Sequence, residues 1–92
     1  MDKTFNVITP YEIYLELKRR AFRESTPEIN YYTICGSLGN GEEMYLLNCA
    51  DKYEIKRVNL TETEIKEMLK VMTKEQIIDE WFNKIKGENN GS

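Results

Sequence analysis

The spacing of apolar residues changes along this chain and divides it into helical and extended segments. Towards both ends apolar residues recur at helical spacing, whereas between residues 29 and 58 they alternate or run together as in strands. The sequence therefore predicts a single α+β domain over residues 1–87, with one helix, a three-stranded antiparallel meander and then two helices (αβββαα). Residues 3–8 predict a short strand or an ordered arm, and residues 88–92 predict a flexible polar tail.

The central segment contains the strongest hairpin signal of the chain. Asn40-Gly41 lies between two apolar runs, and a two-residue type I′ turn needs a positive φ at both central positions. This turn predicts that Ile34 lies opposite Leu47. Because both faces of the resulting ladder are apolar, we expect both to be covered. The first helix would cover one face and the two C-terminal helices the other.

The third strand is predicted over residues 53–58, after a polar break at residues 50–52. It carries Glu54, Lys56 and Arg57. Charges of this kind discourage pairing with other sheets, so we expect an edge strand.

Each expected helix starts with a capping box, in which a threonine side chain and the side chain three residues later cap each other's backbone. The boxes begin at Thr9, Thr61 and Thr73, and Pro10 suits the first helical position. Gly87 is expected just after the last helix. The expected helices are 10–24, 62–72 and 74–86.

The first helix has a wide apolar arc, which includes Phe22, and should be well buried against the sheet. Its cationic end allows two interpretations. It is either a phosphate-binding patch, or a solvated helix end in which Glu16 pairs with Arg20 and cations complement the helix dipole. The cations concerned are Lys18, Arg19, Arg20 and Arg23.

Composition indicates an ordinary globular chain of 92 residues with a net charge of −3. No apolar run approaches the roughly 20 residues that span a bilayer, and the first residues lack a signal-peptide pattern. Cys35 and Cys49 form no closely spaced pair and are expected to be reduced thiols. These features predict a cytoplasmic protein.

Most catalytic chemistry finds no residues here, so we expect no enzyme, no metal and no cofactor. The chain has no histidine, and its glycine-rich segment 36–41 lacks the Lys-Ser/Thr of a phosphate-binding loop. One alternative is a metal-dependent nuclease, since Asp51, Glu54 and Lys56 resemble the Glu-x-Lys half of a PD-(D/E)xK nuclease motif.

The remaining interpretation is a small protein-binding module with an acidic surface. Exposed carboxylates would steer association with a basic partner, while tyrosine and arginine are frequent hot-spot residues. The candidate partner-binding residues are Glu42, Glu43, Asp51, Glu54, Tyr31 and Arg19.

The αβββαα order, the length and the Asn-Gly hairpin with nearby acids resemble small phage-encoded anti-CRISPR proteins. This resemblance implies an inhibitor that binds a CRISPR nuclease of a bacterial host, with no membrane partner. The alternative from another class is a small nucleic-acid-binding transcriptional regulator that uses Lys18, Arg19, Arg20 and Arg23. In that case binding would be strongly salt-dependent.

Overall fold

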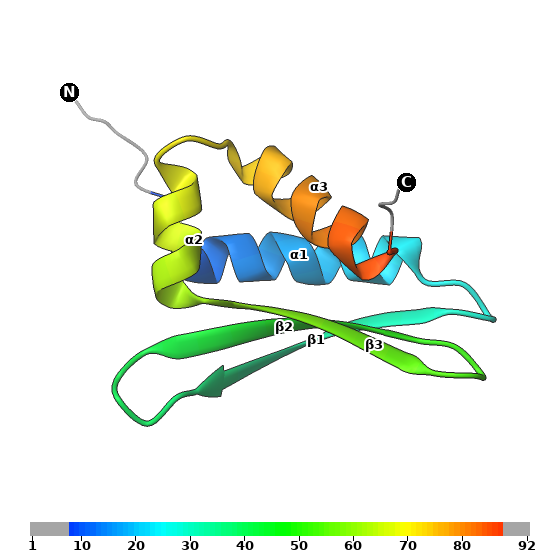
Figure 1. Ribbon diagram of the computed structural model, residues 1–92. Helices are drawn as coiled ribbons and strands as arrows, with labels where there is room; N and C mark the ends of the chain where they lie inside the picture. The colour runs from blue at the N-terminus through cyan, green and yellow to red at the C-terminus, as the bar shows by residue number, and fades with distance from the viewer. Residues whose placement is uncertain (1–7, 88–92) are drawn as a thin grey trace.

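The computed structural model describes residues 8–87, in which three helices lie on one side of a three-stranded sheet (Figure 1). This arrangement confirms the predicted αβββαα order. The strand predicted over residues 3–8 and the tail predicted over residues 88–92 lie outside the described residues, apart from Ile8, which belongs to no helix or strand. The elements are α1 (Pro10–Glu24), β1 (Asn30–Ser37), β2 (Glu43–Ala50), β3 (Ile55–Thr61), α2 (Glu62–Leu69) and α3 (Lys74–Ile85).

All three predicted capping boxes form. At the first, the Thr9 hydroxyl accepts from the Glu12 backbone N–H at 3.2 Å, and the Glu12 carboxylate accepts from the Thr9 N–H at 3.0 Å. The boxes at Thr61 and Thr73 repeat this reciprocal pattern. Each box satisfies two backbone groups that a helix start otherwise leaves unpaired. The three helices therefore begin where the sequence predicts.

α3 ends at Ile85, one residue before its predicted end, and the bounds of α2 and β3 differ further from the predicted ones. α2 ends at Leu69, not at residue 72, because the backbone N–H groups of Lys70 and Val71 donate to carbonyls only three residues back, in a tighter turn than the α-helix. β3 covers Ile55–Thr61, not 53–58. The start is later because residues 51–54 form the preceding turn, and the strand then continues into the α2 cap.

The hairpin between β1 and β2 differs from the predicted two-residue turn. Gly39 and Gly41 both have a positive φ, of 88° and 90°, and the Leu38 N–H donates to the Glu42 carbonyl at 2.8 Å. The loop therefore contains three residues, with Asn40 between the two glycines. This shifts the register by one residue, so that Ile34 pairs with Leu46 and not with Leu47.

The register shift decides which side chains face the helices. Because side chains alternate along a strand, a shift of one residue moves β1 to the opposite face relative to β2. Tyr31 and Thr33 now share the helix-facing side with Tyr45 and Leu47, and Tyr32 and Ile34 turn away from it.

The core lies between the helices and this single face of the sheet. The Trp81 indole N–H donates to the Val58 carbonyl at 3.0 Å and joins α3 to β3. The apolar side chains of α3 are buried, while Met68, Leu69 and Met72 are half-buried against the core. The buried apolar residues are Ile13, Tyr14, Leu17, Ala21, Tyr45, Leu47, Leu60, Ile65, Ile77, Ile78, Trp81, Phe82 and Ile85.

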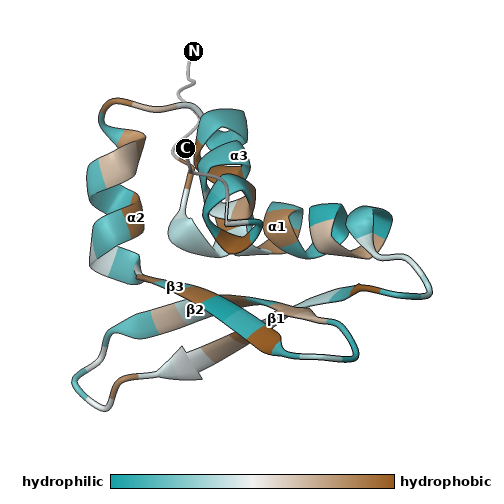
Figure 2. Cartoon of the chain, turned by 45° about the vertical axis from the view of Figure 1, so that its right-hand side comes forward, coloured by the Kyte–Doolittle hydropathy of each residue, from teal (hydrophilic) through white to brown (hydrophobic). Residues whose placement is uncertain are grey.

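The expectation that helices cover both faces of the sheet is wrong. All three helices gather on one side, and apolar positions on the strands remain without a helical cover on the other (Figures 1 and 2). The physical reason is that α1 and α3 bury their apolar residues in one shared core on the same face of the sheet. The hydrogen bond from Arg20 on α1 to Asp79 on α3, at 3.0 Å, lies within this layer. The fold is thus a two-layer α+β arrangement with an open meander sheet.

Candidate protein-binding surface

The uncovered face of the sheet is the largest departure from an ordinary closed core. The register places on it the alternate residues of each strand, starting with Tyr32 and Ile34 on β1. Ile34 and Ile55 are 45% and 60% exposed. We call this set the open face. Its residues are Asn30, Tyr32, Ile34, Gly36, Met44, Leu46, Asn48, Ala50, Ile55, Arg57, Asn59 and Thr61.

A polar pair lies in the middle of the open face. Asn48 on the central strand is fully buried, although no helix covers this side, because it lies between Tyr32 on β1 and Arg57 on β3. The Arg57 Nε–H donates to Asn48 Oδ1 at 3.0 Å. The Asn48 Nδ2 group is buried and has no hydrogen-bond partner among the described residues. Buried amide donors normally have acceptors, so this donor is the energetic irregularity of the sheet.

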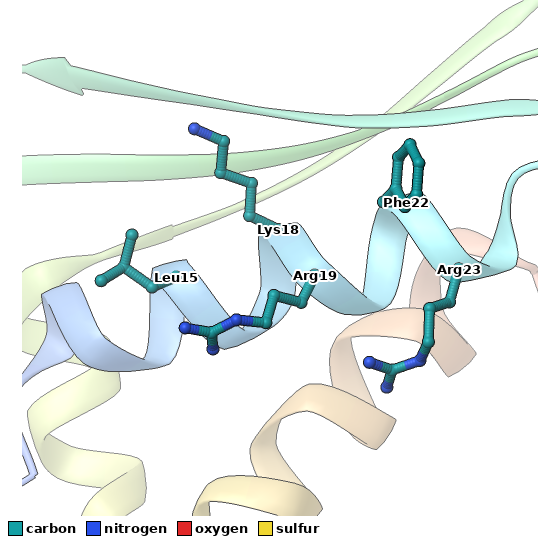
Figure 3. Close-up of a pocket in the computed structure, with 5 residues that line it drawn as sticks. All are labelled: Leu15, Lys18, Arg19, Phe22 and Arg23. Carbon is teal, nitrogen blue, oxygen red and sulfur yellow. The ribbon is translucent and has the colours of Figure 1, made fainter.

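A second feature lies on α1, beside the β1 edge. Two open grooves of about 520 and 540 Å³ share Lys18 and Phe22. Figure 3 shows that Lys18 and Phe22 point towards the sheet, whereas Arg19 and Arg23 point away from it. Phe22 is 84% exposed, although the predicted apolar arc included it. α1 is consequently less buried than the sequence predicts, and it displays an aromatic ring next to cations.

The four predicted cations of α1 do not form one patch. The Arg20 guanidinium donates to Glu24 at 2.8 Å and to Asp79 at 3.0 Å, and it lies 5.0 Å from the centre of the Phe82 ring. These hydrogen bonds raise the pKa of Arg20 and hold that of Glu24 below its usual value. Glu16 pairs with Arg19 at 2.8 Å, not with Arg20 as expected. Arg20 is thus a structural link between α1 and α3.

The predicted acidic residues of the first hairpin make internal contacts. The Glu42 carboxylate accepts from the Thr63 backbone N–H at 3.0 Å, in the first turn of α2. Hydrogen bonds from Thr63 lower the pKa of Glu42. Glu43 accepts from the Cys35 thiol at 3.2 Å. Burial and this contact together raise the pKa of that thiol. Glu42 therefore ties the hairpin tip to α2.

Asp51 and Glu54 lie in the other hairpin, at the opposite end of the meander from Glu42 and Glu43 (Figure 1). The Asp51 carboxylate accepts from the backbone N–H groups of Tyr53 and Glu54 at 2.8 and 2.9 Å, and these bonds lower its pKa. Glu54 is exposed and lies 3.8 Å from Lys56. The predicted acidic residues thus form two separate pairs, not one continuous surface.

The two other candidate residues have different surroundings. Tyr31 is half-buried, its ring centre lies 5.4 Å from that of Phe82, and burial raises its pKa to about 12. Arg19 is exposed on α1 and lines one of the two grooves. Tyr31 belongs to the edge of the core, whereas Arg19 is accessible to a partner.

The sequence reasoning missed Phe22, Arg57 and the open face as binding features. Phe22 was assigned to the buried arc, and Arg57 was interpreted as a protective edge charge. The available signal is the largely apolar character of both ladder faces, which also fits one covered face and one docking face. For the nuclease alternative, no group of three metal-ligating side chains occurs within residues 8–87.

Comparisons add no relative to this description: no protein-family model, curated protein or solved structure matches the chain. In the described part of the chain, no helix combines the length and the apolar character that crossing a bilayer demands.

Proposed function

We propose that this chain is a non-enzymatic protein-binding module that docks a partner protein on the open face of its sheet. The observation that carries the proposal is the apolar set Tyr32, Ile34, Leu46 and Ile55, which no helix covers and which shares the open face with Arg57. Continuous apolar patches on soluble proteins commonly mark interaction sites. Tyrosine and arginine near the centre of such a patch are typical hot-spot residues.

The chemistry of the open face defines its partner. Arg57 is the only charged residue among the strand positions on this face. A matching partner surface is apolar and carries one carboxylate that pairs with the Arg57 guanidinium. Burial would strengthen such a pair, because charge-assisted hydrogen bonds are stronger than neutral ones. Asn48 Oδ1 accepts from the Arg57 Nε–H at 3.0 Å and so positions the guanidinium group on this face.

The resemblance in overall plan to anti-CRISPR proteins makes a CRISPR nuclease the first partner class to test. In this proposal the inhibitor acts by occupying a protein surface with its sheet. The alternative, a nucleic-acid-binding regulator, draws support from Phe22 beside three exposed cations, because exposed aromatic rings among cations stack on bases. Partner capture separates the protein-binding module from the nucleic-acid-binding regulator.

The test is capture of partners from bacterial lysate and from purified CRISPR nucleases, followed by affinity measurement. The double variant Ile34→Thr/Ile55→Thr keeps β-branching in both strands and removes apolar area from the open face. Val71→Thr is the matched control, because Val71 is 81% exposed in the turn between α2 and α3. We expect the double variant to lose at least about tenfold in affinity and the control to be unchanged.

Two results would overturn the proposal. One is a captured protein whose affinity is the same for the double variant and the native chain. The other is recovery of nucleic acid alone, with an affinity that falls steeply with salt and is lost in Phe22→Ala. The second result would support the regulator.

A further inference from the structure

The free edge of β1 lacks the features that usually protect an edge strand. β1 (Asn30–Ser37) contains no charged residue and no proline, and residues 34–37 are exposed. The opposite edge strand, β3, carries Lys56 and Arg57. Natural sheets protect their edges with charges, prolines or a covering element, because unpaired backbone groups recruit another strand. An uncharged and exposed edge is therefore suited to receive one.

The hydrogen bonds of Ser25 identify which backbone groups point outwards. The Ser25 hydroxyl accepts from the Tyr31 N–H at 2.9 Å and lies 3.2 Å from the Tyr31 carbonyl oxygen. Both Tyr31 groups therefore point away from β2. Because this direction alternates along a strand, Thr33 and Cys35 also present their N–H and C=O groups at the outer edge. Ser25 closes the first position of the edge, and the stretch from Thr33 onwards is open.

The groove beside this edge adds chemical selectivity. It is lined by Lys18 and Phe22 from α1 and by Tyr31, Tyr32 and Thr33 from β1. Lys18 and Phe22 point towards the sheet in Figure 3. The Thr33 hydroxyl oxygen in this groove is buried and has no hydrogen-bond partner in the described part of the chain. A strand added here would place every second side chain under α1, close to the Lys18 ammonium group.

The remaining side chains of such a strand would extend the open face. They would lie next to Tyr32 and Ile34, so apolar residues fit there. We infer that the β1 edge, roofed by Lys18 and Phe22, binds an extended segment of a partner protein in which acidic and apolar residues alternate. This inference rests on the proposed protein-binding function and names the segment that the partner contributes. Backbone pairing supplies affinity and the alternating side chains supply specificity.

A second copy of this chain fits the edge less well. Antiparallel pairing of two β1 strands about a twofold axis places both α1 helices on the same side of the joined sheet. Each copy would then bring Lys18 and its neighbouring cations towards those of the other, and like charges at close range are destabilising. An acidic strand instead neutralises Lys18. Charge complementarity therefore favours the heterologous segment.

The probe is a labelled peptide of alternating glutamate and valine, titrated against the purified chain and followed by fluorescence anisotropy. Comparison peptides alternate lysine and valine, or contain the glutamates and valines in blocks. A fourth peptide carries N-methyl groups on its glutamates, which remove the donors that an antiparallel added strand would direct at Thr33 and Cys35. We expect binding of the alternating acidic peptide, with at least about a tenfold loss for each of the others.

Protein variants test the same geometry from the other side. Cys35→Pro removes an outward N–H without touching the ladder to β2, and prolines are tolerated at such edge positions. Cys35→Val keeps the N–H and serves as its control. Lys18→Glu should exchange the preference, so that the lysine–valine peptide binds better than the glutamate–valine one. Lys84→Glu on α3 should leave the preference unchanged. Circular dichroism establishes that each variant is folded.

Several outcomes overturn the inference. If block and alternating peptides bind equally, or if Lys18→Glu leaves the preference unchanged, the edge does not select the proposed pattern. A concentration-dependent dimer that Cys35→Pro abolishes assigns the edge to a second copy. If Cys35→Pro does not fold, the N-methylated peptide decides, because equal binding of that peptide excludes strand addition. The edge experiments can fail while a captured partner still binds Ile34→Thr/Ile55→Thr more weakly than the native chain. In that case the inference about the β1 edge is wrong and the proposed function stands.

Discussion

The Nε–H of Arg57 donates a 3.0 Å hydrogen bond to Oδ1 of Asn48, across the pairing of β3 with β2. The charged residue of the open face thereby lies over a fully buried polar one. The bond fixes the Asn48 amide so that Nδ2 is the group left without an acceptor. An apolar residue would fill the same position without this cost. We therefore interpret the Asn48–Arg57 pair as a contribution to partner binding and not to the stability of the fold.

Replacing Asn48 by valine tests this interpretation. Removal of a buried amide with an unpaired donor should leave the free energy of unfolding unchanged or raise it by up to about 1 kcal/mol. The same change should weaken partner binding. Urea denaturation measures the first effect, with Asn59→Val on the exposed part of the same face as the control for strand propensity. A loss of more than about 2 kcal/mol relative to the control would mean that the amide is satisfied and structural.

The three-residue hairpin loop makes a sharp prediction about glycines. Gly39 and Gly41 have positive φ values, and Gly36 in β1 does not, while a Cβ at any of the three would have nothing within 4 Å. Gly39→Ala and Gly41→Ala should therefore each lower the free energy of unfolding by about 1 kcal/mol through backbone strain alone. Gly36→Ala should be neutral or stabilising by about 0.5 kcal/mol.

Thermal and urea unfolding of the three variants provide the measurement. A neutral Gly39→Ala beside a destabilising Gly41→Ala would show that only Gly41 is held in the left-handed region. That result would restore the two-residue turn and the register with Ile34 opposite Leu47.

The helices could be read from the sequence because their signals are local. Thr9, Thr61 and Thr73 each act on residues within one turn, and tertiary contacts do not change which N–H groups they reach. The register depends on one additional residue in a loop. Asn40-Gly41 supports a two-residue turn, but Gly39 can adopt a positive φ equally well, and the sequence does not decide between them.

For a related reason, the sequence does not show which face of the sheet the helices cover or where the candidate site lies. The spacing of Arg20 indicates a surface cation, whereas its partner Asp79 lies 59 residues away, on α3. α1 and α3 share one core on one side of the sheet, which leaves the other face open, and local spacing does not indicate this arrangement. Glu42 likewise appeared as a free acid, and its partner Thr63 belongs to a helix that sequence spacing could not locate in space. Long-range pairing accounts for both differences.

Acid should weaken the link between α1 and α3. The pKa of Glu24 is held below its usual 4.5, chiefly by the hydrogen bond from Arg20. A carboxylate with a depressed folded-state pKa stabilises the fold fully above its unfolded pKa. This contribution disappears as the pH falls through the folded-state value. The native chain should therefore lose more stability between about pH 6 and pH 3 than Glu24→Gln.

Urea titrations at both pH values measure this difference. Glu67→Gln is the matched control, since it removes an exposed pair with Lys70 on α2, and exposed pairs contribute little. If Glu24→Gln loses as much stability in acid as the native chain, Arg20 does not stabilise the ionised form of Glu24. The link between the helices would then rest on Asp79 and on the Phe82 ring.

Charge reversal at the two hairpins distinguishes structural acids from binding ones. Glu42→Lys removes the acceptor of the Thr63 N–H and places a cation at the start of α2, where the helix dipole favours an anion. It should lower the melting temperature more than Glu54→Lys, because Glu54 is exposed and lies 3.8 Å from Lys56. If the open face binds the partner, Glu54→Lys changes the affinity by less than about threefold. If Glu54→Lys instead melts at the temperature of the native chain but loses much of its affinity, the partner binds at the hairpin that carries Asp51 and Glu54. Glu54→Lys is the variant that locates the partner, because a loss of binding in Glu42→Lys would accompany a loosened α2.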